Sequence, residues 1–165
     1  MLKLSHTSLI VISGLIWLIV GCVLLPLGLN FIVDGVLKEN FNASTHPILD
    51  FFIPIAGGVE QAALLLIACA LAIGFMKGRY VFGKSVQRSV TRILTLPNPE
   101  SILKLYSFPY LMLLGSMFLL GYIVKFLPLD VRGCVDVVIG SALINGAVLF
   151  FRQAWAVKER SNQAL

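Results

Sequence analysis

Two carboxylates stand at the entrances of long apolar stretches. Glu60 is followed by apolar residues with no further charge until Lys77, and Asp136 precedes a second such stretch. A carboxylate at the mouth of a membrane pathway concentrates cations. A carboxylate in the first turn of a helix is also stabilised by the helix dipole, with no role in transport. The sequence leaves both interpretations open.

Three uncharged polar side chains lie within the same stretches: Gln61, Ser141 and Asn145. A buried amide or hydroxyl must find hydrogen-bond partners. In a membrane these groups either join neighbouring helices or line a polar pathway. We therefore treat Glu60, Gln61, Asp136, Ser141 and Asn145 as the pathway or entrance candidates.

No set of residues typical of an enzyme is present. His6 and His46 are the only histidines, and no two of the three cysteines form a CxxC pair. Metal centres and thiol oxidoreductases depend on such clusters. We expect no catalytic residues, no metal site and no cofactor, although an enzyme acting on lipid remains a third-ranked alternative.

The elements that would position these residues are membrane helices. The chain has 165 residues, of which 58% are hydrophobic and 13% charged, whereas soluble domains carry about 25% charged residues. The apolar stretches are continuous rather than alternating, which favours helices over a barrel. About 20 apolar residues cross the hydrocarbon core. Four stretches qualify: Leu9–Phe31, Pro54–Met76, Phe108–Leu127 and Val135–Trp155.

The charges predict the orientation of these spans. Ten basic residues fall on one predicted side of the membrane and three, Lys38, Lys125 and Arg132, on the other. Basic residues favour the cytoplasmic side. We therefore predict that both termini are cytoplasmic, in a multi-pass protein of a bacterial inner membrane. We interpret the formal net charge of +5 as topology and contact with anionic lipids, and expect no nucleic-acid partner.

The predicted fold class is thus an all-α integral membrane protein with four transmembrane helices in two hairpins. It forms one domain, with the first hairpin at residues 9–76, a cytoplasmic segment at 77–107, the second hairpin at 108–155 and a tail at 156–165. Glu60 and Asp136 each follow a glycine by three residues, Gly57 and Gly133. This spacing suggests a parallel repeat of the two hairpins, which the sequence alone does not establish.

The cytoplasmic segment contains an amphipathic helix with a basic stripe. Lys84, Arg88 and Arg92 recur every four residues, while Val86, Val90, Ile93 and Leu94 fall on another face. Such a helix either extends the second span or lies along the membrane surface. Gly78 and Gly83 allow a bend. We expect the three basic side chains to contact lipid headgroups.

Small residues recur every seven positions along the predicted spans, which keeps them on one face of a helix. Small residues let membrane helices approach closely. We expect these faces to mediate helix packing and homo-oligomer formation. They comprise Gly14, Gly21, Gly28 and Gly35 in the first span, Ala56, Ala63 and Ala70 in the second, and Gly133, Gly140, Ala147 and Ala154 in the fourth.

The leading functional hypothesis is a small oligomeric channel or transporter for a small solute, most simply a cation, with Glu60 and Asp136 at its outer entrance. The alternative is a non-transporting membrane scaffold or accessory subunit. It would bind a partner through the glycine-rich faces and the basic cytoplasmic helix.

Overall fold

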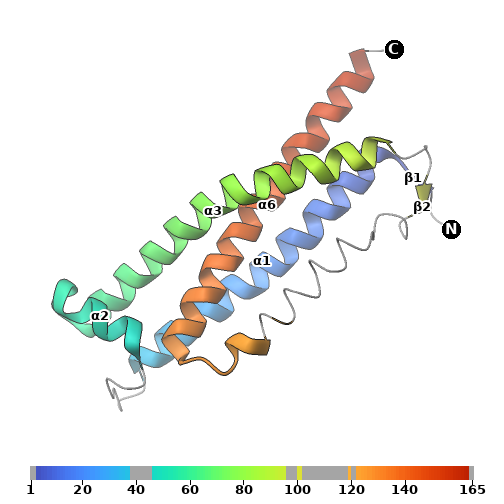
Figure 1. The fold of residues 1–165 in the computed structure, drawn as a ribbon. Coiled ribbons are helices and arrows are strands. Elements are labelled where there is room, and N and C mark those ends of the chain that lie inside the picture. Colours follow the sequence, from blue (N-terminus) through green and yellow to red (C-terminus); the bar gives the residue numbers. More distant parts are fainter. Residues whose placement is uncertain (1–2, 38–45, 96–99, 102–118, 120–121, 164–165) are drawn as a thin grey trace.

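The residues that the structure describes are mainly helical, with three long helices that lie side by side (Figure 1). The computed structural model describes residues 3–37, 46–95, 100–101, 119 and 122–163. Helix α1 spans His6–Leu37, α3 spans Val59–Thr95 and α6 spans Leu129–Gln163. Each of the three is long and apolar enough to cross a membrane. The predicted third span, Phe108–Leu127, lies largely outside the described residues.

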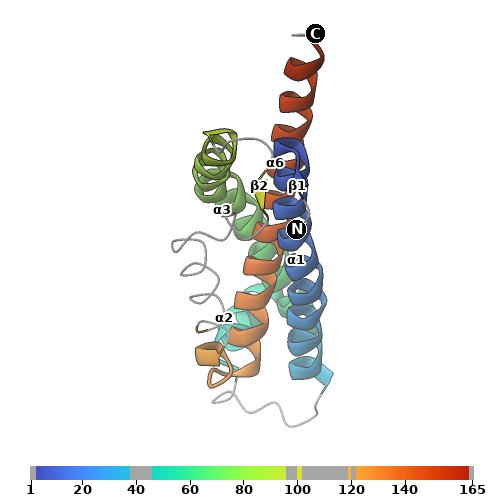
Figure 2. The same cartoon turned by 90° about the vertical axis from the view of Figure 1, so that its right-hand side faces the viewer.

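Helices α3 and α6 run in the same direction, and α1 runs against both (Figures 1 and 2). At one end of the bundle, the two-residue strand β1, Lys3–Leu4, pairs antiparallel with β2, Glu100–Ser101. At the other end lies the short helix α2, Pro47–Ala56, beside the starts of α3 and α6 (Figure 1). The chain therefore enters α1 and leaves α3 at the same end.

The predicted span Pro54–Met76 is not one continuous helix, because its first residues belong to α2. Pro54 lies inside α2, and the helical chain is interrupted at Gly57 and Gly58 before α3 begins. Gly57 has a left-handed backbone with φ of 82°, and its N–H donates to the carbonyl oxygen of Ile53 at 2.9 Å. Glycine adopts this conformation without a steric penalty, so it ends helices readily.

Helix α3 continues through the predicted basic segment without a break. Gly78 and Gly83 both lie inside it, so the basic segment extends α3 and does not form a separate helix. Val86, Val90 and Ile93 are buried, and their core also contains Leu9 of α1 and Phe150 of α6. Leu94, expected on the same face, is 43% exposed. The apolar face of the basic segment thus packs into the bundle.

Candidate functional site

The contact between α1 and α6 brings glycine backbones together. A β-carbon added at Gly28 would lie 2.8 Å from the carbonyl oxygen of Gly133, and one added at Gly21 would lie 2.9 Å from that of Gly140. Real β-carbons essentially never approach other atoms this closely. The pairs are seven residues apart on each helix, as two antiparallel helices in a constant register require.

Gly14 and Gly35 continue the same face of α1 toward side chains rather than backbone. An added β-carbon at Gly14 would lie 2.9 Å from the ring of Phe151, and one at Gly35 would lie 3.3 Å from the ring of His46. The six glycines predicted for helix packing therefore all lie at contacts within one chain: Gly14, Gly21, Gly28, Gly35, Gly133 and Gly140.

The contact between α3 and α6 depends on two glycines that the sequence analysis did not assign to packing. Gly74 packs against Ser141, with an added β-carbon 2.5 Å from the carbonyl oxygen of Val138. At Gly78 the added atom would lie 2.9 Å from the α-carbon of Ala142. The spacing of four residues in Gly74-x-x-x-Gly78 was the available signal, because it places both on one helix face. The alanines that recur every seven residues predicted other packing residues in this span.

Asn145 and Ser141 take part in this contact. The Asn145 side-chain amide donates to the carbonyl oxygen of Phe75 in α3 at 2.9 Å, and the Ser141 hydroxyl donates to the carbonyl oxygen of Val138 one turn earlier at 3.1 Å. Of the two roles considered for Asn145, the hydrogen bond between helices is the one that this geometry displays.

Glu60 and Asp136 lie in dissimilar places. Glu60 is exposed in the first turn of α3, next to exposed Gln61. Asp136 was expected near the start of its helix, but α6 begins earlier, at Leu129. Asp136 is therefore two turns inside the helix, 7% exposed, with its β-carbon facing Gly28. The proposed alignment of Glu60 with Asp136 thus does not pair equivalent helix positions.

Asp130, which the sequence analysis passed over, is the acidic residue in the first turn of α6. It is fully buried. One carboxylate oxygen accepts hydrogen bonds from the backbone N–H groups of Ile48 at 2.7 Å and Leu49 at 3.2 Å. N–H groups in the first turn of a helix have no partner within that helix, so Asp130 caps α2 from a distant part of the sequence. His46 makes no side-chain cap hydrogen bond to α2, and Asp130 fills that role.

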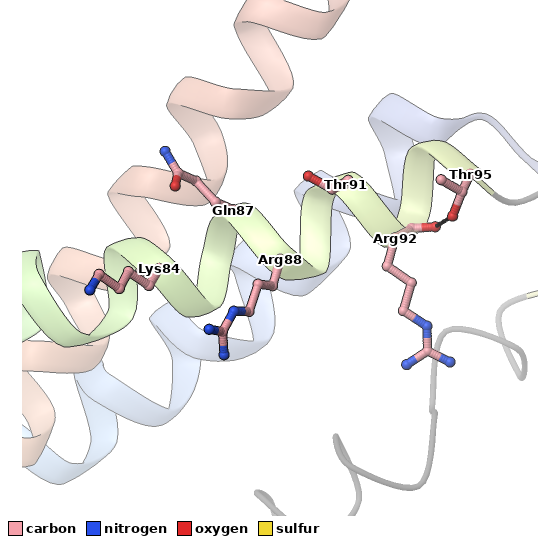
Figure 3. Close-up of a pocket in the computed structure, with 6 residues that line it drawn as sticks. All are labelled: Lys84, Gln87, Arg88, Thr91, Arg92 and Thr95. Atoms are coloured by element: carbon pink, nitrogen blue, oxygen red, sulfur yellow. Dashed lines mark hydrogen bonds between the residues drawn. The ribbon is translucent and has the colours of Figure 1, made fainter.

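The basic stripe of α3 forms an exposed, shallow furrow (Figure 3). Because the opposite face is buried with Val86, Val90 and Ile93, the helix cannot rotate the stripe inward. Arg88 and Arg92 extend from one side of the helix and Gln87 from the other (Figure 3). The Thr95 hydroxyl donates to the carbonyl oxygen of Arg92 at 2.8 Å. The furrow is lined by Lys84, Gln87, Arg88, Thr91, Arg92 and Thr95.

The furrow carries side chains of the kinds that bind anions in proteins. Cations recur once per helical turn along one edge, and hydroxyl or amide groups recur along the other. Arginine donors match the geometry of carboxylate and phosphate groups. Within the described residues, no group of three or more histidine, cysteine, aspartate or glutamate side chains is placed to hold a metal ion.

Comparison with known proteins adds no family to these observations, because no protein-family model, curated protein or solved structure matches the chain.

Proposed function

We propose that the protein is a four-span membrane scaffold or accessory subunit that holds an anionic partner on its cytoplasmic side through the α3 furrow. The observation that carries this proposal is the furrow itself: cations and hydrogen-bonding groups line the exposed face of a helix whose other face is fixed in the core. The glycine-rich faces, by contrast, are occupied by contacts inside the chain. The proposal therefore assigns partner binding to the basic helix.

The four-span topology has support from the residues on either side of the undescribed stretch. Ser101 lies at the end of the bundle where α1 begins, because β2 pairs with β1. Asp130 lies at the opposite end, because it contacts the start of α2. Ser101 and Asp130 therefore lie at opposite ends of the bundle. With an additional span between Ser101 and Asp130, both termini lie on the same side of the membrane. The excess of basic residues on that side indicates that it is the cytoplasmic side.

Co-purification from membranes tests the partner proposal. The double variant Arg88→Gln with Arg92→Gln should lose a partner that the wild-type protein retains at fixed stoichiometry. Lys158→Gln with Arg160→Gln removes the same charge from exposed positions near the end of α6 and should retain that partner. Equal retention by both variants would remove the furrow from partner binding.

A second candidate function is a cation entrance at the outer end of α3. It is favoured by one observation: Glu60 and Gln61 are both exposed in the first turn of that helix. Asp136, Ser141 and Asn145 lie at contacts between helices, so in this candidate the pathway runs between copies of the chain. Cation flux into liposomes containing the purified protein tests it, with Glu60→Gln as the variant that should reduce flux.

A further inference from the structure

We infer that the bilayer ends on the cytoplasmic side near Lys77–Tyr80 of α3, and that Arg88 and Arg92 bind an acidic helical segment of a partner protein in water rather than lipid headgroups. The inference rests on the proposed function and deepens it by naming the partner's chemistry. It revises the expectation that Lys84, Arg88 and Arg92 form one lipid-headgroup site.

The exposed apolar side chains mark the part of the bundle that lipid covers. On α1 the large exposed apolar residues run from Leu15 to Leu37, and on α3 all of them but Tyr80 and Leu94 lie between Leu64 and Met76. Lys77, Arg79 and Tyr80 follow on α3, all exposed. Basic and aromatic residues of this kind are typical of a membrane interface. The lipid-facing surface of α3 therefore ends at Lys77.

The exposed apolar surfaces of α1 and α3 reach their limits at about the same level of the bundle. The ring of Trp17, two residues after Leu15, lies 4.7 Å from the ring of Phe82, measured between centroids. Phe82 itself follows Tyr80 by two residues. The start of the exposed apolar surface on α1 thus lies beside its end on α3, as expected if a single bilayer boundary crosses both helices there.

Beyond this level, apolar residues face inward. Leu9 and Ile10 are at most 1% exposed and share a core with Val90 and Ile93. A hydropathy pattern counts Leu9 as part of a span although lipid does not reach it, because it cannot distinguish a buried apolar residue from a lipid-facing one. The first span predicted from the sequence, Leu9–Phe31, therefore begins nearly two helical turns before the exposed apolar surface of α1 does, whereas the predicted end of the second span, Met76, agrees with that surface.

The outer surface of this end of the bundle is mainly polar. Arg152, Lys158 and Arg160 are exposed on α6. Among the described residues at this end, two large apolar side chains remain exposed: Leu94 at 43% and Trp155 at 68%. The Trp155 indole N–H donates to the carboxylate of Glu159 at 2.9 Å.

Axial distance separates the basic residues of α3 into two groups. At 1.5 Å per residue, Lys84 lies about 10 Å from Lys77, Arg88 about 16 Å and Arg92 about 22 Å. The headgroup layer is roughly 5–7 Å thick on each side, and salt screens charge over about 8–10 Å. A helix tilt of about 20° shortens these distances by only about a twentieth. Lipid headgroups are therefore within reach of Lys77, Arg79 and Lys84, whereas Arg88 lies at the limit of that reach and Arg92 lies beyond it.

The remaining part of the furrow matches an acidic amphipathic helix. Arg88 and Arg92 are one helical turn apart, the spacing that glutamates four residues apart present on a partner helix. Thr91 and Thr95 offer hydroxyl groups beside the arginines, and exposed Leu94, seven residues after Gln87, adds an apolar side chain on the Gln87 side of the helix. Charge complementarity with carboxylates thus combines with one apolar anchor, as in many protein interfaces.

The position of the boundary is tested by cysteine labelling in a variant whose native cysteines are replaced by alanine. Ile12 lies inside the span predicted from hydropathy, and the structure leaves it partly exposed on the cytoplasmic side of Leu15. Ile12→Cys in inside-out vesicles should react with an impermeant maleimide, whereas Leu27→Cys should not. Protection of Ile12→Cys to the same degree as Leu27→Cys would overturn the boundary.

The ligand is tested with two double variants of equal charge loss, each as full-length protein in nanodiscs. The probe is a synthetic helical peptide with glutamates at positions i, i+4 and i+8. In zwitterionic nanodiscs, Arg88→Gln with Arg92→Gln should weaken peptide binding about ten-fold, given up to about five-fold per exposed ion pair. Lys77→Gln with Arg79→Gln should change it by less than about two-fold.

The same variants, incubated with anionic phospholipid, should show the reverse order: retention of that lipid during purification falls for the Lys77 and Arg79 variant and stays near wild type for the Arg88 and Arg92 variant. Greater lipid loss for the Arg88 and Arg92 variant would return these arginines to a headgroup site and overturn the inference. That result leaves the proposed function standing, because co-purification of a partner tests it separately.

Discussion

The two faces of α6 pack against their neighbours by different geometries. Toward α1, glycines from both helices meet at intervals of seven residues, so that Gly21 faces Gly140 and Gly28 faces Gly133. Toward α3, two glycines four residues apart, Gly74 and Gly78, contact larger residues of α6. Both contacts bring backbone atoms of the neighbouring helix within 3 Å of an added β-carbon, and the second adds the hydrogen bond from Asn145.

Both geometries limit what each contact should tolerate. Where two backbones touch, neither side can move away from an added atom without separating the helices. Gly28 and Gly78 each meet backbone atoms in this way. Neither contact should therefore tolerate an added β-carbon, and the α3–α6 contact should respond in addition through its hydrogen bond.

The largest effect is expected for Gly28→Ala. The added β-carbon would lie 2.8 Å from both the Gly133 carbonyl oxygen and the Val137 amide nitrogen, so the helices must separate, at a cost of about 1–3 kcal/mol. Gly83→Ala is the matched control, because nothing lies within 4 Å of its added β-carbon and alanine is the better helix former by up to about 1 kcal/mol. Unfolding in detergent should rank Gly28→Ala below wild type and Gly83→Ala at or above it. A Gly28→Ala protein as stable as the control would contradict the backbone contact.

Removal of the Asp130 carboxylate should have the next largest effect. Asp130→Ala leaves the N–H groups of Ile48 and Leu49 without their acceptor. A hydrogen bond to a charged group contributes about 1.5–3 kcal/mol to the free energy of unfolding. We expect a loss of about 2 kcal/mol, with faster hydrogen exchange confined to α2. Unchanged exchange in α2 would show that Asp130 does not hold that helix.

Asn145→Ala should cost less. Hydrogen bonds between membrane helices contribute roughly 0.6 kcal/mol on average and up to about 1.7, so we expect a loss of about 0.5–1.5 kcal/mol in unfolding free energy. Gly78→Ala disturbs the same contact, because its added β-carbon would lie 3.2 Å from that of Asn145. The double variant should therefore be non-additive. Strict additivity would mean that the two residues do not share one contact.

The smallest stability effect is expected for Glu60→Gln. An exposed carboxylate in the first turn of a helix contributes about 0.3–1 kcal/mol through the helix dipole, and 0.5 M salt should reduce that contribution by screening. Thermal unfolding at low and high salt checks this expectation. A loss larger than that of Asn145→Ala would show that Glu60 has a contact beyond the dipole.

These comparisons also show how far the sequence could predict the structure. Helix class and the glycine face of α1 follow from composition and a seven-residue period, because both depend on local pattern alone. The start of α6 and the break at Gly57 were missed, because apolar residues continue across both boundaries. The role of Asp130 depends on α2, a helix about eighty residues earlier, and no local pattern encodes that contact.

The candidate site was predictable in part. The basic stripe at Lys84, Arg88 and Arg92 and the end of the apolar stretch at Met76 are visible in the sequence, but that one unbroken helix joins them required the structure. Asn145 could be identified as a polar residue that needs a partner. The identity of that partner, the Phe75 carbonyl group, required the structure.

The orientation of α3 is the claim on which the proposed function depends most directly, and two glutamines of this one helix test it. Gln61 and Gln87 are both exposed, near opposite ends of α3. In intact cells expressing a variant without native cysteines, an impermeant maleimide should label Gln61→Cys, and should label Gln87→Cys only after the membrane is permeabilised. Labelling of Gln87→Cys in intact cells, with Gln61→Cys protected, would place the furrow outside the cytoplasm and contradict the account.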